Sequence, residues 1–231
     1  MAQDSGEFTL VKEAKGVWDN IFLESVTIPD NIIDIKDWAF SFCNNLSEIT
    51  IPDSVASIGS GAFAFCISLQ EITIPNSVKS IGDCAFEFCN RLKEIIISYG
   101  VKNIGNDAFA FCTSLTEIKI PNSVKHIRSR AFLGCNNIKK IIISNKVTRI
   151  RDYVFAFCDN LSEIAIPNSV KRIENSAFIF CTKLIKITIP NSVTSIEDNA
   201  FYGCESLTIN AHEGSYAERF AKEHNIPFEK I

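Results

Sequence analysis

Residues 69–91 read LQEITIPNSVKSIGDCAFEFCNR, and the same pattern returns every 23 residues along the chain. A fixed period of about 20 to 50 residues is typical of a solenoid, in which each unit buries its apolar face only by stacking on its neighbours. We therefore predict one elongated body from these 231 residues. The column that shows the period most plainly is cysteine: Cys43, Cys66, Cys89, Cys112, Cys135, Cys158, Cys181 and Cys204.

Within one unit, the residue pattern predicts a strand, a turn and a return to the core. Ile72 and Ile74 lie two residues apart, so both side chains face the same side of a short strand. Pro75 has no N–H to donate and ends that strand. Val78 then points back inward, and the apolar spacing within residues 85–89 predicts a short helical turn packed against the strand.

The two ends of the repeat differ from its middle. We expect residues 1–22 to form an N-terminal cap, residues 23–209 to form the solenoid, and residues 210–231 to form a C-terminal capping helix and tail. Ser215 and Glu218 have the spacing of a capping box, which predicts where the helix begins.

Composition excludes several classes of protein. The net charge is −4 and acids and bases are mixed along the chain, which gives no support to nucleic-acid binding. No apolar run is long enough to span a membrane. The first residues, MAQDSGEFTLVKEAKG, show no signal peptide, and this leaves an intracellular protein and an exported protein both open.

Written as LxxIxIPxxVxxIGxxAFxxC, the unit strongly resembles the BspA-type class of leucine-rich repeats, and GSYAERFAKEHNIPFE (214–229) resembles the closing segment of that family. The resemblance covers Leu23 to the end of the chain. It implies an α/β solenoid: a curved right-handed superhelix with a parallel β-sheet on its concave face and short helical turns on its convex face. It also implies a cell-surface or secreted protein associated with adhesion to host proteins or other cells.

The cysteine column has three interpretations: metal ligands, disulfides, or a ladder of buried reduced thiols. Metal sites need clustered ligands, and each unit offers one thiol. Parallel side chains at strand spacing are poorly placed for disulfides. We favour the reduced ladder, because free cysteine behaves as a small buried hydrophobe. Cys84 lies off the column, and we expect it to be exposed.

The same residues predict no enzyme. His126, His212 and His224 lie at unrelated repeat positions, and no nucleophile and base share a recognisable pattern. We therefore assign no catalytic residue, no metal ligand and no cofactor.

Outward-facing strand positions are the better functional candidates. The glutamates of consecutive units repel one another modestly, which a cationic partner would relieve. Solvent-facing apolar residues such as Ile96 and Ile142 often mark contact surfaces. The plainer alternative is a solvated sheet face. We predict a partner-binding patch on the concave face that comprises Glu71, Glu94, Ile96, Tyr99, Glu117, Lys119, Lys140, Ile142 and Glu163.

A basic stripe follows the valine column. It balances the glutamates and keeps the body soluble, or else it docks to acidic glycans or anionic surfaces. Its members are Lys79, Lys102, Lys125, Lys171, Arg149 and Arg172.

Taken together, the sequence favours a non-enzymatic recognition module that binds a protein ligand, such as a host or matrix protein, with a glycan as a further candidate. We expect a monomer or weak oligomer. A structural or assembly scaffold and an intracellular interaction protein are the alternatives.

Overall fold

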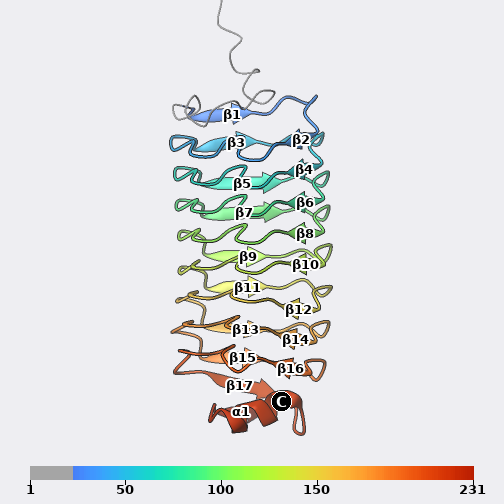
Figure 1. Ribbon diagram of the computed structural model, residues 1–231, viewed down its shortest axis with the longest axis vertical. Helices are drawn as coiled ribbons and strands as arrows, with labels where there is room; N and C mark the ends of the chain where they lie inside the picture. Colours follow the sequence, from blue (N-terminus) through green and yellow to red (C-terminus); the bar gives the residue numbers. More distant parts are fainter. Residues whose placement is uncertain (1–22) are drawn as a thin grey trace, which may run out of the picture.

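The computed structural model describes residues 23–231, and the predicted N-terminal cap, residues 1–22, lies outside the described residues. The chain winds into a column of stacked coils, each with a longer strand on one side and a two-residue strand on another (Figure 1). The longer strands are β1 (Ser25–Thr27), β3 (Glu48–Thr50), β5 (Glu71–Ile74), β7 (Glu94–Ile97), β9 (Glu117–Lys119), β11 (Lys140–Ile142), β13 (Glu163–Ala165), β15 (Lys186–Thr188) and β17 (Thr208–Ala211). We call the outward side of these strands the long-strand face.

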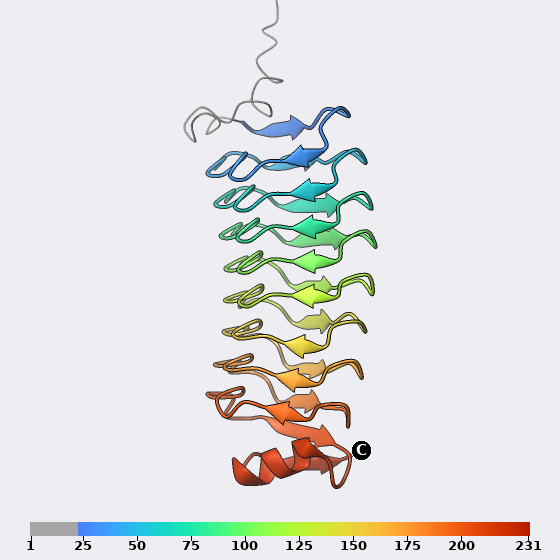
Figure 2. The same ribbon diagram turned by 45° about the vertical axis from the view of Figure 1, so that its right-hand side comes forward.

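The second set of strands was not expected from the sequence. They are β2 (Asp34–Ile35), β4 (Ser57–Ile58), β6 (Ser80–Ile81), β8 (Asn103–Ile104), β10 (His126–Ile127), β12 (Arg149–Ile150), β14 (Arg172–Ile173) and β16 (Ser195–Ile196). We call their outward side the short-strand face. Figure 2 shows the two sets running in opposite directions across the column, because the chain reverses at the turn between them.

Strand pairing between coils is parallel and keeps a 23-residue offset from β1 to β16, whereas Lys186 of β15 pairs with Thr208 of β17 at an offset of 22. Glu71 pairs with Glu94 and Ile72 with Ile95, so each residue lies beside its own counterpart in the next coil. The same offset holds on the short-strand side, where Ile58 pairs with Ile81. Residues at the same repeat position therefore lie next to one another from the first coil to the coil that contains β15 and β16.

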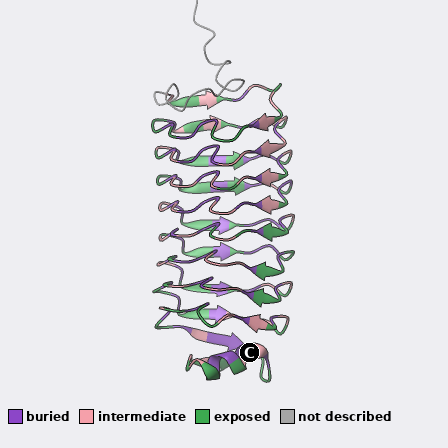
Figure 3. Cartoon of the chain, viewed as in Figure 1, coloured by how far each residue is buried: buried purple, intermediate pink, exposed green. Residues whose placement is uncertain are grey.

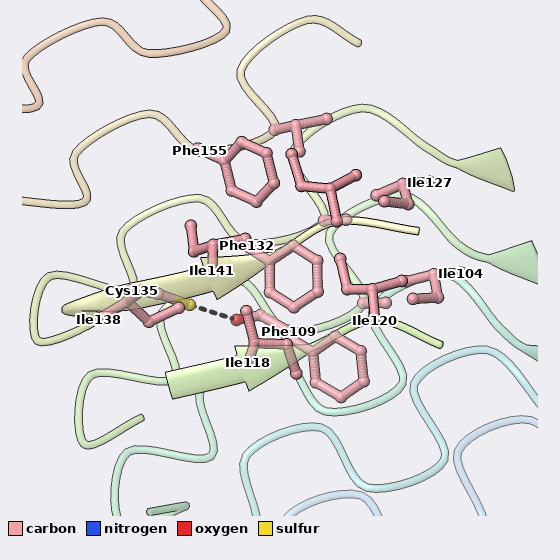
Figure 4. Packing of buried hydrophobic residues seen from close by; sticks show 14 of the residues in the cluster. Ile104, Phe109, Ile118, Ile120, Ile127, Phe132, Cys135, Ile138, Ile141 and Phe155 are labelled. Atoms are coloured by element: carbon pink, nitrogen blue, oxygen red, sulfur yellow. Dashed lines mark hydrogen bonds between the residues drawn. The ribbon is translucent and has the colours of Figure 1, made fainter. Parts of the chain in front are cut away.

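The core runs the length of the column as one cluster. Figure 3 shows the alternation that builds it, with buried and exposed residues following one another along the strands. Rings of the central phenylalanine column, Phe40 to Phe201, stack with centroids 5.1 to 5.8 Å apart. Three of them, Phe109, Phe132 and Phe155, lie in succession in Figure 4.

All eight cysteines of the column are buried free thiols. Figure 4 shows one of their bonds, in which Cys135 Sγ donates to the Phe109 carbonyl oxygen at 3.1 Å. Six further thiols repeat this contact 26 residues apart, at 3.0 to 3.5 Å. Burial raises the pKa of Cys89 and of Cys135 to about 12, so these thiols stay protonated.

The predicted helical turns are wrong, and with them the α/β description. Within residues 84–89, Cys84 and Phe88 have left-handed backbone conformations, with φ of 55° and 59°. A right-handed helical turn cannot include residues in this conformation. Phe86 N–H donates to Ala108 O at 2.7 Å, in the next coil, instead of to its own turn. The fold is a parallel β-solenoid that contains one helix within residues 23–231, and the column bows only slightly (Figures 1 and 2).

That helix, α1 (Tyr216–Glu223), covers the last coil. It begins where the capping-box spacing predicts, since the Ser215 hydroxyl accepts from Glu218 N–H at 3.1 Å. Three residues of the helix itself, Ala217, Phe220 and Ala221, are buried. A final strand, β18 (Phe228–Lys230), pairs in parallel with β17 and covers that edge.

Thiol accessibility gives a direct test of this packing. The ninth cysteine, Cys84, lies outside the column and is half-buried, whereas the sequence predicted it to be exposed. Burial and the neighbouring Glu87 carboxylate raise the pKa of Cys84 to about 12. A thiolate-selective aromatic disulfide reagent should therefore modify the native protein slowly and at Cys84 alone, and should modify all nine cysteines in denaturant. Rapid reaction of several thiols in the native protein would contradict the buried ladder.

Candidate functional site

The long-strand face carries two parallel rows of outward side chains. They are outward because alternate residues of each strand point to opposite sides of the sheet. The first row is acidic in the early coils, where Glu71 pairs with Glu94, and mixed later, where Glu117 pairs with Lys140 and Glu163 with Lys186. Charge on this face therefore changes from acidic to mixed along the column.

Two surface hollows follow this change of charge. One, of about 460 Å³, lies over β3, β5 and β7 and is lined by Glu48, Glu71, Glu94 and the threonines between them. The other, of about 480 Å³, lies over β11, β13 and β15 and is lined by Lys139, Lys140, Glu163 and Lys186. Ile96 also lines the acidic hollow.

The structure places eight of the nine predicted patch residues on outward positions of β5 to β13, and all eight are exposed. The ninth, Tyr99, lies in the turn after β7 with 67% of its surface exposed. Ile96 and Ile142 are 51% and 44% exposed, and they lie one coil to either side of Lys119. We call Ile96, Tyr99, Lys119 and Ile142 the apolar patch.

A proline follows the long strand in most coils, as Pro75 does after β5, but the coil that contains Ile142 has no proline at this position. Ser144 replaces it and is fully buried, and its hydroxyl donates to Val124 O at 2.6 Å. The same hydroxyl accepts from Lys146 N–H at 3.2 Å. This serine therefore stabilises the turn in place of proline.

A second aromatic ladder lies at the turn edge of the column, and the sequence reasoning did not identify it as a ladder. Phe42, Phe65, Phe88 and Phe111 stack with centroids 4.6 to 4.9 Å apart, although each has a left-handed φ of 59° to 62°. Such angles cost L-residues roughly 1–2 kcal/mol each, which ring stacking offsets. Gly134 takes the next position at φ 69° and ends the stack.

The titratable groups of the described coils do not assemble a reactive centre. Within residues 23–231 no three His, Cys, Asp or Glu side chains lie close enough to hold a metal ion. His212 and His224 bond to carbonyl oxygens near the C-terminus, at Ile231 and Phe220. His126 lies on the short-strand face, beside the basic stripe predicted from the sequence.

Comparison with known proteins agrees with this geometry. The family model for the BspA type leucine-rich repeat region matches residues 14–138 and 91–208, in six copies. The chain belongs to the BspA-type leucine-rich repeat family. Proteins built from leucine-rich repeats are generally non-enzymatic scaffolds that bind proteins. None of the curated protein sequences matches the chain.

Solved structures of several bacterial leucine-rich repeat proteins are similar to this BspA-type chain. A protein from Bacteroides ovatus is 29% identical with a TM-score of 0.66, over 82% of this chain and 55% of its own. The Treponema pallidum leucine-rich repeat protein is 26% identical with a TM-score of 0.66, over 89% of this chain and 85% of its own. One from Eubacterium ventriosum is 30% identical with a TM-score of 0.62, over 68% of this chain and 42% of its own. The BspA-type chain thus spans about half the length of the Bacteroides and Eubacterium proteins.

No helix in the part of the BspA-type chain that the structure describes is long and apolar enough to cross a membrane.

The aromatic ladder predicts an unusual order of stabilities. Replacing Phe88 by alanine or by glycine removes the same two ring stacks, but only glycine also relieves the left-handed backbone angle. Phe88→Gly should therefore retain about 1 kcal/mol more unfolding free energy than Phe88→Ala, measured by denaturant titration. A more stable alanine variant would show that the backbone at this position is not strained.

Proposed function

We propose that the chain is a non-enzymatic protein-recognition module that binds a partner protein through its long-strand face. The observation that carries this proposal is the apolar patch. Ile96 and Ile142 are exposed at outward positions where the other coils carry threonine, lysine or alanine. When a partner covers apolar side chains that were exposed to water, the free energy of the system falls, which favours binding.

The surroundings of the patch define the chemistry of the partner. Glu71, Glu94 and Glu117 lie on neighbouring coils beside Ile96, and like charges at strand spacing repel one another. A partner with an apolar contact surface and flanking lysines or arginines would cover the isoleucines and relieve that repulsion. Parallel strands fix these positions before binding, which lowers the ordering cost of association.

We further propose that the protein acts at the cell surface or after secretion, as an adhesion-type protein whose partner is a host or matrix protein. This part rests on the resemblance to the family, whose repeats generally serve protein interaction.

The apolar patch can be tested with a matched pair of double variants. Ile96→Thr with Ile142→Thr places the residue of other coils at both positions. Loss of two apolar anchors should weaken binding at least about tenfold, since buried anchors in an interface contribute ~1 kcal/mol or more each. The measurement is surface plasmon resonance of the chain over immobilised extracellular matrix proteins.

The control is Ile33→Thr with Ile185→Thr, which alters two isoleucines that are 62% and 56% exposed and lie outside the patch. It should bind within about twofold of the parent chain. The proposal fails if no protein of the panel binds the parent chain, if the patch variant binds normally, or if both variants lose binding equally.

A further inference from the structure

The short-strand face gathers cations from four consecutive coils. The first residue of the short strand is exposed in β10, β12 and β14, and only partly buried in β2, β4, β6, β8 and β16. Figure 3 shows these three strands in the colour of exposed residues. We call this group the basic face: Lys102, Lys125, Arg128, Arg149, Arg151, Lys171 and Arg172.

Three neighbours enlarge the stripe predicted from the sequence. Arg128 and Arg151 follow β10 and β12 directly, at the position that Gly59, Gly82 and Gly105 occupy in earlier coils. His126 is the exposed first residue of β10 and adds further positive charge when it is protonated. The cations therefore cover both sides of the short strands and form a broad surface.

This positive charge is poorly balanced by acids. Arg149 and Arg172 each meet one carboxylate, Glu174 and Glu197, at 3.5 Å. Among residues 23–231 no ion pair involves the other five members of the basic face. The face is thus cationic in a chain whose net charge is −4.

The register places like charges side by side. Arg149 and Arg172 are direct partners in the parallel pair of β12 and β14. Lys125 N–H donates to Lys102 O at 2.9 Å, so these two lysines also lie on adjacent coils. Neighbouring strands are about 4.8 Å apart, and like charges at that distance destabilise a sheet. An anionic ligand that spans several coils would convert this repulsion into attraction.

We propose that the basic face binds an acidic polysaccharide, an extended chain that carries sulfate or carboxylate groups. Arginine side chains bind such groups through two parallel hydrogen bonds, and lysines add point charges between them. Asn103 and Thr148, which lie among the cations, offer polar groups to sugar hydroxyls.

The composition of the face favours a polysaccharide over other polyanions. Single-stranded nucleic acids are bound by aromatic side chains that stack on bases, and proteins that read duplexes insert a helix or ribbon into a groove. Peripheral membrane binding adds apolar side chains that enter the lipid. The outward residues directly before and after the inward isoleucines of β8, β10, β12 and β14 include no Phe, Tyr, Trp, Leu, Ile or Val. Tyr153, in the turn after Arg151, is half-buried.

The experiment measures binding of heparin, a sulfated polysaccharide, by isothermal titration calorimetry at several salt concentrations. The test variant carries Lys102→Gln, Lys125→Gln and Arg128→Gln. The parent chain should bind with an affinity that falls as salt rises, and the variant should bind at least about tenfold more weakly with a shallower salt dependence. Thermal unfolding checks that both chains fold.

The control variant removes three positive charges elsewhere: Lys93→Gln, Lys139→Gln and Lys183→Gln. These exposed lysines lie outside both the basic face and the apolar patch, and the control should bind heparin within about twofold of the parent chain. A single-stranded oligonucleotide and anionic phospholipid vesicles serve as competing probes and should bind more weakly than heparin.

Four results would overturn the proposal: no heparin binding by the parent chain, equal losses in the test and control variants, normal binding by the test variant, or tighter binding of the oligonucleotide or the vesicles. Because the two faces are altered by different substitutions, failure here leaves the protein-binding role of the long-strand face unaffected.

Discussion

The solenoid depends on hydrogen bonds between successive coils in a register of 23 residues. Backbone N–H groups that would form helical turns in an isolated unit donate instead to the next coil, as Phe86 does to Ala108 and Phe88 to Ala110. This register places each core residue on its own counterpart, which is why the phenylalanine rings stack and the thiols repeat one contact with a carbonyl oxygen. A single coil has no partner for either interaction, so the fold is stabilised mainly by contacts between neighbours.

The same register determines what the surface can do. Inward positions must accept an identical neighbour above and below, and they vary little. Outward positions do not pack against identical neighbours in the core, so their residue types can differ from coil to coil. Each outward residue lies beside its counterpart in the next coil. The result is two rigid faces of different chemistry. The long-strand face changes from acidic to mixed charge and exposes Ile96 and Ile142, and the short-strand face is cationic, with Arg149 paired with Arg172. The proposed protein and polysaccharide sites both arise from this separation.

The sequence predicted the elements that depend on a simple period. The 23-residue spacing predicted that the units stack on one another, and the spacing of Ile72 and Ile74 predicted which side of the long strands faces outward. Ser215 predicted where α1 begins. The sequence did not predict the conformation of residues 84–89, because apolar spacing alone cannot distinguish a helical turn from one with left-handed residues at Cys84 and Phe88.

The candidate sites were predicted to a similar extent. The patch residues lie together as strand alternation requires. Arg128 and Arg151 were missed, because they directly follow short strands that the sequence did not predict. The pairing of β18 with β17 was missed as well, since it follows an offset of 19 residues and lies outside the repeat.

The most direct test of the account is to shorten the column by one whole period and compare it with a shorter deletion. Removing residues 92–114 joins Arg91 to Leu115 and leaves every remaining residue on its counterpart. Removing residues 92–103 joins Arg91 to Ile104 and breaks the register. Monitored by circular dichroism, the first protein should unfold in one cooperative transition close to that of the parent chain, and the second should lose this transition. Equal stability of the two deletions, or unfolding of the first, would contradict the central role of the register.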